Sequence, residues 1–99
     1  MKKILLIEDD NNYIWHIKNF LHRKGYHVLV ASTVSQGKEL IEKEQILIIS
    51  SDLKLSDGSG MELLEYLQEK AYKIPFLFSH AMTKSIMRKK RWKRELRYA

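Results

Sequence analysis

The stretch IISSDLKLSDGSG occupies residues 48–60 and changes from apolar to mostly polar residues along its length. An apolar run leads into two serines and Asp52, and a loop follows that contains Asp57, Gly58 and Gly60. A carboxylate at the mouth of a buried strand is costly unless the protein uses its charge. The stretch therefore indicates a buried strand that ends at a functional loop.

Three other apolar runs of strand length lie on either side of this stretch. Segments 4–7 and 26–31 precede it, and segment 76–79 follows Pro75. The intervening segments carry apolar residues at helical spacing: Tyr13, Ile14, Ile17, Phe20 and Leu21; Leu40 and Ile41; and Met61, Leu63, Leu64 and Leu67. Strands that alternate with helices through short connections predict an α/β fold, with a parallel sheet covered on both faces.

Local signals predict where the first two helices begin and end. Asp10 or Asn11 is the expected N-cap of the first helix, and Ser32 or Thr33 that of the second, because short polar side chains accept hydrogen bonds from free helix amides. Gly25 is expected to end the first helix in the left-handed conformation.

The composition limits the classes of protein to consider. The chain has 99 residues, 44% of them hydrophobic, which suits one small domain with a core. It has no cysteine, which excludes disulfides and thiolate metal sites. No apolar run approaches the roughly 20 residues that span a bilayer, and the N-terminal MKKILLIEDD becomes acidic too early for a signal peptide. We expect a cytoplasmic protein that does not enter a membrane.

Positive charge is concentrated at the C-terminus. Residues 1–83 contain ten Lys/Arg and eleven Asp/Glu, whereas residues 84–99 contain eight Lys/Arg and one Glu. We therefore divide the chain into a domain, 1–83, and a basic helix or tail, 84–99. Trp92 and Tyr98 lie among the cations, a pattern that suits weak nucleic-acid binding through phosphate contacts and stacking. A solvated helix accounts for the same pattern and is the commoner case.

Three carboxylates follow two of the predicted strands. Glu8 and Asp9 end the first strand and Asp52 ends the third, so they converge if these strands are neighbours, because ligands in open parallel sheets bind beyond the carboxyl ends of strands. Mg²⁺ prefers such oxygen ligands and would relieve the repulsion between the carboxylates. Helix capping and turn formation explain each acidic group separately, but not their joint placement.

Four segments in order resemble the receiver domain of two-component response regulators: KKILLIEDD, GYHVLVA, SSDLKLSDGSGMELL and IPFLFS. The resemblance covers about residues 2–81. It implies a flavodoxin-like parallel sheet of strand order 2-1-3-4.

The resemblance also implies roles for individual residues. Asp52 matches the position that accepts a phosphoryl group, and Glu8 and Asp9 match the acidic pair that holds Mg²⁺. Lys54 matches the residue whose backbone carbonyl completes the metal site. The implied partner is a sensor histidine kinase or a phosphotransfer protein.

The sequence departs from the family pattern near the end of strand four. The family places a hydroxyl residue five positions past the proline, where this chain has His80, whereas Ser79 lies one position earlier. Ser79 is therefore the candidate switch hydroxyl, with His80 as the alternative by position. Strand side chains alternate between faces, so one residue of offset matters. Ser56 also stands where these domains usually have proline.

The family's last strand and helix have no counterpart in the sequence. Pro75 is the only proline, so the Lys-Pro loop whose lysine contacts the phosphoryl group is absent. Lys84, Lys89 and Lys90 lie nearby, but their spacing assigns none of them this role. The phosphate-contacting lysine is therefore unknown, and the fifth strand and fifth helix are missing or replaced.

Two functions follow from the matches and the departures. The first is a receiver that accepts a phosphoryl group on Asp52 with Mg²⁺. Its only catalysis would be self-phosphorylation and dephosphorylation at Asp52, with no independent enzyme activity. The alternative is a shortened receiver that is not competent for phosphorylation and acts through protein or nucleic-acid contacts.

The expected loss of a fifth strand leaves strand four at the sheet edge, with Phe76 and Phe78 on it. An exposed apolar edge favours pairing with a second chain, so we expect a homodimer formed edge to edge or by exchange of the terminal helix. The competing arrangement has residues 84–97 folded back over the domain, with Met87, Trp92 and Leu96 facing inward.

Overall fold

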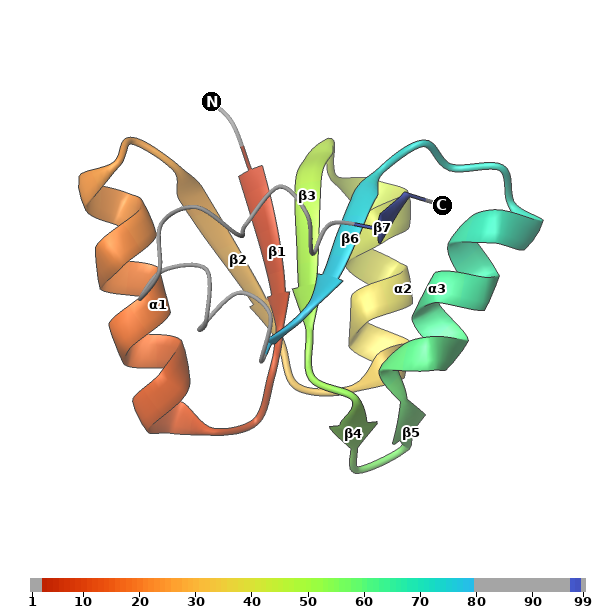
Figure 1. The fold of residues 1–99 in the computed structure, drawn as a ribbon, viewed down its shortest axis with the longest axis horizontal. Helices are drawn as coiled ribbons and strands as arrows, with labels where there is room; N and C mark the ends of the chain where they lie inside the picture. The colour runs from red at the N-terminus through yellow and green to blue at the C-terminus, as the bar shows by residue number, and fades with distance from the viewer. Residues whose placement is uncertain (1–2, 80–96, 99) are drawn as a thin grey trace.

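The computed structural model describes residues 3–79 and 97–98 of the chain (Figure 1). A central sheet has helix α1 on one face and helices α2 and α3 on the other. The elements in chain order are β1 (Lys3–Ile7), α1 (Asn11–Arg23), β2 (His27–Ala31), α2 (Val34–Lys43), β3 (Ile46–Ser51), β4 (Lys54–Leu55), β5 (Gly58–Ser59), α3 (Gly60–Glu69), β6 (Pro75–Phe78) and β7 (Arg97–Tyr98).

The order of strands in the main sheet is β2-β1-β3-β6-β7. Strand β1 pairs in parallel with β2 and β3, with Leu5 opposite both Leu29 and Ile49. Strand β3 pairs in parallel with β6, and the last pair joins Ser51 to Phe78. Since β6 is the fourth strand expected from the sequence, the predicted α/β class and the order 2-1-3-4 are confirmed.

The prediction that strand four is the bare edge of the sheet is wrong along part of its length. Strand β7 pairs antiparallel with β6, with Tyr98 opposite Pro75 and Arg97 opposite Phe76. Residues 97–98 of the same chain therefore supply hydrogen-bonding groups that a second chain was expected to supply. The domain boundary at 83/84 and the predicted inward-facing Met87, Trp92 and Leu96 lie outside the described residues.

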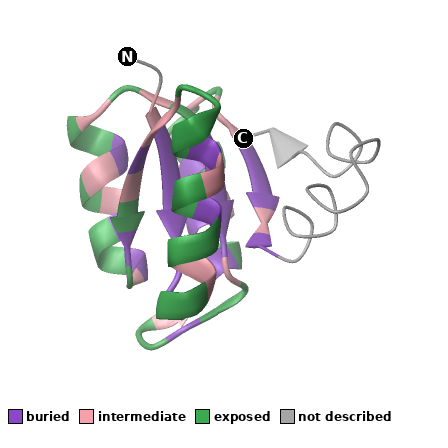
Figure 2. Ribbon diagram, turned by 90° about the vertical axis from the view of Figure 1, so that its left-hand side faces the viewer, coloured by how far each residue is buried: buried purple, intermediate pink, exposed green. Residues whose placement is uncertain are grey.

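The two faces of the sheet carry separate apolar clusters. Figure 2 shows that the strands between the helices consist largely of buried residues. Successive strand residues point to opposite faces, so Leu5 packs toward α2 and α3 whereas Leu6 packs toward α1. The helices contribute their buried residues: Ile17 and Leu21 from α1, Val34 and Ile41 from α2, and Leu63 and Leu67 from α3. Full burial on both faces explains why the strands read as continuous apolar runs.

The predicted helix ends agree with the structure. Asp10 caps α1 and accepts hydrogen bonds from the amides of Asn12 and Tyr13. Gly25 follows that helix with a φ of 89°, the left-handed conformation that glycine adopts without strain. Of the two candidates for the second cap, it is Thr33 whose side chain accepts from the amide of Gln36.

The segment after β3 is more ordered than the sequence suggested. Where the sequence predicted only a loop after Asp52, β4 and β5 form a short antiparallel hairpin. Lys54 pairs with Ser59 and Leu55 with Gly58, and Leu55 is buried in the core shared with α2 and α3. Ser59 then caps α3 as part of a capping box with Glu62. The chain is thus fixed from β3 through the hairpin to α3.

Candidate functional site

Glu8, Asp9 and Asp52 form a compact acidic cluster at the carboxyl end of the sheet. One carboxylate oxygen from each lies within 4.8 Å of the others. Glu8 is buried, Asp52 is half-buried and Asp9 is exposed. The convergence predicted from the sequence is therefore present in the structure, and the cluster is open to solvent on one side.

Backbone hydrogen bonds beyond the strand ends place the cluster. The Glu8 amide donates to the Ala31 carbonyl at 2.9 Å, which extends the pairing of β1 with β2 by one residue. The Asp52 amide donates to the Ile7 carbonyl at 2.9 Å, which extends the pairing of β3 with β1. The backbone of both acidic residues is therefore held by hydrogen bonds to the sheet, and the positions of their carboxylates do not depend on a flexible loop.

The electrostatics of the cluster disfavour three ionised carboxylates without a counter-ion. Burial raises the pKa of the Glu8 carboxyl above its ordinary value of 4.5, and the neighbouring Asp52 raises it further. The backbone amides of Asp10 and Asp9 donate to Glu8 Oε2 and lower that pKa in part. The net direction of the Glu8 pKa is upward, because burial and the neighbouring carboxylate outweigh these hydrogen bonds.

Helix capping accounts for only one of the acidic groups that precede α1. Asp10 Oδ1 accepts from the amides of Asn12 and Tyr13 at 3.0 and 3.2 Å. Glu8 Oε2 accepts from the backbone amides of Asp9 and Asp10, and Glu8 and Asp9 each have a carboxylate oxygen that lies close to Asp52. The set of three carboxylates fits a hard divalent cation such as Mg²⁺, which takes few carboxylates and keeps several waters.

The loop after Asp52 passes very close to the start of α3. The Ser51 hydroxyl donates to the Asp52 carbonyl at 2.8 Å, and the Gly60 amide donates to the Leu53 carbonyl at 2.8 Å. A Cβ at Gly60 would lie 2.4 Å from the Asp52 carbonyl oxygen and 2.9 Å from Ser51 Oγ. Glycine is therefore required there by lack of space. Lys54, the expected carbonyl ligand, is the first residue of β4.

Ser50 and Ser51 at the end of β3 are both buried, although they are polar. Ser51 is used in the loop contact, whereas Ser50 Oγ has no hydrogen-bond partner among the residues that the structure describes. The strand nevertheless pairs with a neighbour on each side.

Asp57 makes a contact that the sequence did not reveal. Its Oδ1 accepts from the Val34 amide at 2.8 Å and its Oδ2 from the Ser35 amide at 3.1 Å. These bonds lower the pKa of the Asp57 carboxyl below its ordinary value of 3.8, with the Val34 amide as the largest cause. The turn dipeptide Asp57-Gly58 was visible in the sequence, but nothing local to it indicates a partner in α2.

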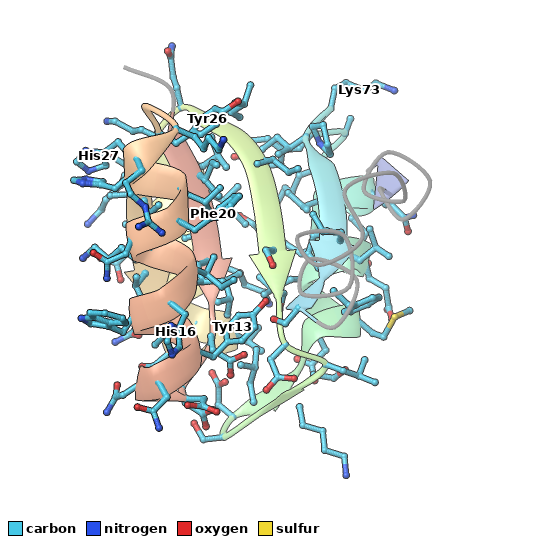
Figure 3. All side chains as sticks on the ribbon, turned by 60° about the vertical axis from the view of Figure 1, so that its left-hand side comes forward. Tyr13, His16, Phe20, Tyr26, His27 and Lys73 are labelled. Carbon is cyan, nitrogen blue, oxygen red and sulfur yellow. The ribbon has the colours of Figure 1, made fainter. Side chains whose placement is uncertain are left out.

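Ser79 and Asp52 each directly follow the last residue pair of the ladder between β3 and β6, Ser51–Phe78. Ser79 is buried, and its carbonyl accepts a hydrogen bond from the Tyr13 hydroxyl at 2.9 Å. Figure 3 shows Tyr13 pointing from α1 toward the sheet. The alternative residue His80 and the lysines Lys84, Lys89 and Lys90 lie outside the described residues.

No helix within the described part of the chain is long and apolar enough to cross a membrane.

Comparisons with known proteins agree with this geometry. The sequence of residues 4–96 matches the family described as "Response regulator receiver domain". The photosynthetic apparatus regulatory protein RegA of Rhodobacter capsulatus is 32% identical over 69 residues, which are 70% of this chain and 38% of that protein. The response regulator receiver protein CpdR of Brucella abortus is 32% identical over 63 residues, 64% of this chain and 52% of that protein. The chain thus spans well under two thirds of these relatives.

Solved structures show the same fold. The non-phosphorylated receiver domain of HemR from Leptospira biflexa superposes with a TM-score of 0.72 at 35% identity, over 79% of this chain and 63% of that chain. A response regulator from Burkholderia pseudomallei, solved with a phosphorylated aspartic acid, a calcium ion and citrate, gives 0.71 at 27% identity over 79% and 46%. From the matched sequence, the sheet order and the acidic cluster together, the chain belongs to the family of response regulator receiver domains of two-component signalling.

Proposed function

We propose that Asp52 accepts a phosphoryl group from a histidine of a sensor kinase or phosphotransfer protein, and that Mg²⁺ bound at the acidic cluster assists the transfer. The observation that carries this proposal is the convergence of Glu8, Asp9 and Asp52 within 4.8 Å at the end of the sheet. Of the three residues, Asp52 is half-buried, and its backbone amide is held by the Ile7 carbonyl of β1.

In the proposed reaction an Asp52 carboxylate oxygen attacks the phosphorus of the donor. A new O–P bond forms, the N–P bond of the phosphohistidine breaks, and the histidine nitrogen keeps the bonding electron pair and takes up a proton. Glu8, Asp9, Asp52 and the Lys54 carbonyl would hold the metal. Bound there, Mg²⁺ supplies positive charge that offsets the charge on the transferring oxygens. Ser79 is the proposed hydroxyl that meets the phosphoryl group.

Two related structures support the choice of chemistry. The Burkholderia pseudomallei response regulator carries a phosphorylated aspartic acid together with a calcium ion. The response regulator MaeR, 25% identical with a TM-score of 0.72, was solved bound to beryllium trifluoride. Both proteins share the fold in which this chain gathers its acidic cluster.

The test is incubation with a small phosphodonor and Mg²⁺, followed by the intact mass of the protein. We expect slow labelling that disappears in Asp52→Asn. We expect the labelling to be slow because the sequence contains no Lys-Pro pair, and losing one preorganised donor to the transferred group costs on the order of 2.7–4 kcal/mol of barrier. Asp10→Asn is the matched control, since it changes an adjacent acid that only caps α1. Labelling that survives Asp52→Asn would refute the assignment.

Metal binding is tested separately by thermal unfolding. Mg²⁺ at millimolar concentration should raise the melting temperature, because a ligand of the native state stabilises that state. The rise should be smaller in Asp52→Asn and unchanged in Asp10→Asn. If wild type shows no response to Mg²⁺, the metal site is absent.

An absence of labelling in a folded protein would favour the second function. The chain would then be a receiver that acts without phosphorylation, through protein contacts or through the basic residues 84–99. Homodimer formation and weak nucleic-acid binding both stay predictions from the sequence.

A further inference from the structure

The hairpin formed by β4 and β5 connects β3, which leads into Asp52 of the acidic cluster, with α3. It begins at Lys54, two residues after Asp52, and runs into α3 at Gly60. In Figure 1 the hairpin extends beyond the end of β3 and lies next to the first turns of α2 and α3. A hairpin with two residues in each strand is at best marginally stable alone, so its position depends on what holds it.

The base of the hairpin is held by contacts with Asp52 itself. The Gly60 amide donates to the Leu53 carbonyl, and the Cα of Gly60 packs against the Asp52 carbonyl too closely to leave room for a Cβ. Leu55 anchors the middle of the hairpin by its burial in the core. The position of the hairpin is therefore coupled directly to the backbone of Asp52.

The tip of the hairpin is held by α2. Asp57 Oδ1 and Oδ2 accept from the Val34 and Ser35 amides, the first two of the helix. The third amide, of Gln36, is satisfied by the cap residue Thr33 at 3.1 Å. The free amides at the start of α2 are thus divided between its own cap and a carboxylate from another element. A negative charge at a helix N-terminus is also favoured by the helix dipole.

We propose that Asp57 is a positioning residue for the acidic cluster: by tying the hairpin to the N-terminus of α2, it fixes the backbone from Asp52 to Lys54 in the arrangement that binds the metal. Asp57 does not touch the metal or the phosphoryl group in this scheme. It acts through the hairpin: Asp57 holds the tip of the hairpin and Gly60 holds its base. The effect on Mg²⁺ rests on the proposed function, whereas the tether itself does not.

Three variants of the full chain separate this role from helix capping. Asp57→Ala removes both bonds to α2, and Asp57→Asn keeps one oxygen acceptor. Thr33→Ala is the matched control, because it removes a cap from the same end of α2 but leaves the hairpin tied. Mg²⁺ affinity is measured by titration calorimetry, and amide hydrogen exchange of Lys54 and Gly60 is measured in Mg²⁺-free buffer.

We expect Asp57→Ala to raise the Kd for Mg²⁺ about tenfold, the low end of the range for residues that support metal ligands indirectly. Asp57→Asn should fall between Asp57→Ala and wild type. The hairpin amides should exchange faster in Asp57→Ala. Thr33→Ala should leave the Kd and the hairpin exchange unchanged, even though it also lowers the melting temperature.

Unchanged exchange of the hairpin amides in Asp57→Ala would overturn the inference, as would an unchanged Kd. Equal effects of Thr33→Ala and Asp57→Ala would also overturn it, because loss of the helix end would then be the cause. If wild type itself does not bind Mg²⁺, the proposed function fails while the exchange measurement still decides whether Asp57 holds the hairpin. The two failures are therefore distinguishable.

Discussion

Gly60 is the glycine with the least room in the structure, and Gly60→Ala should be markedly destabilising. The new Cβ would meet backbone, the Asp52 carbonyl oxygen at 2.4 Å, which cannot move without shifting the acidic cluster. Forced overpacking of this kind costs about 1–3 kcal/mol. Urea unfolding measures the loss.

Gly37→Ala is the matched comparison. Its Cβ would meet Ile7 Cδ1 at 3.0 Å and the Leu63 methyls at 3.4 Å, which are the ends of side chains and not backbone atoms. Replacing glycine inside a helix also gains about 0.5–1 kcal/mol of backbone entropy. A loss in Gly37→Ala as large as that in Gly60→Ala would contradict the view that contact with the Asp52 backbone is decisive.

Asp57 should make stability depend on pH in the acid range. Its pKa is lowered in the folded protein from 3.8, so its contribution is fully present above that value and is lost as pH falls below it. The difference in free energy of unfolding between wild type and Asp57→Asn should therefore shrink as pH falls through this range. Urea unfolding at a series of pH values measures it.

Other carboxyls do not obscure this comparison. Glu39 and Glu44 also have lowered pKa values, caused by hydrogen bonds from Lys43 and Lys3, but they titrate alike in both proteins and cancel in the difference. A wild-type advantage that stays constant from neutral pH to well below 3.8 would show that the Asp57 charge is not what matters.

A long-range hydrogen bond from the Tyr13 hydroxyl to the Ser79 carbonyl ties α1 to the residue that follows β6. Tyr13→Phe keeps the ring and removes this bond, so it should cost about 0.5–1.5 kcal/mol of stability. Chemical unfolding gives the value. Tyr26→Phe is the control, because it makes the same chemical change at a half-buried tyrosine beyond the other end of α1, remote from Ser79, and it should be close to neutral. Equal losses in the two variants would contradict the assigned role of the bond.

The elements that the sequence predicts best are those encoded locally. The ends of α1 follow from Asp10 and Gly25, and the strand order follows from alternation together with the family resemblance. The sequence did not predict the strands of the hairpin or β7, because each of these strands is only two residues long. Their stability comes from tertiary contacts, such as burial of Leu55, that no local pattern records.

The same distinction applies to the acidic site. Glu8, Asp9 and Asp52 were predictable because parallel strands bring their carboxyl ends to one edge. The contacts of Asp57 and Tyr13 were not, since their partners lie in other elements and their residue types are common in turns and on helices. The roles of Asp52, Lys54 and Ser79 stay predictions for experiment.

For the whole molecule, β7 should limit self-association. It covers β6 at Pro75 and Phe76, part of the edge at which a second chain was expected to pair. Deleting residues 97–99 frees that edge, so the truncated chain should show a larger apparent mass than the full chain. Light scattering coupled to size exclusion at moderate salt measures both. If the two proteins have the same mass at all micromolar concentrations, β7 does not protect the edge.

The position of β1 between β2 and β3 has a consequence for synthesis. This strand is made before both of its neighbours, and Ile4, Leu5, Leu6 and Ile7 are all buried in the completed sheet. The nascent chain must therefore carry an apolar segment without its second neighbour until Ser51 has emerged from the ribosome, a delay on the order of seconds at ordinary elongation rates. During that interval the apolar residues of β1 are available for contact with other chains.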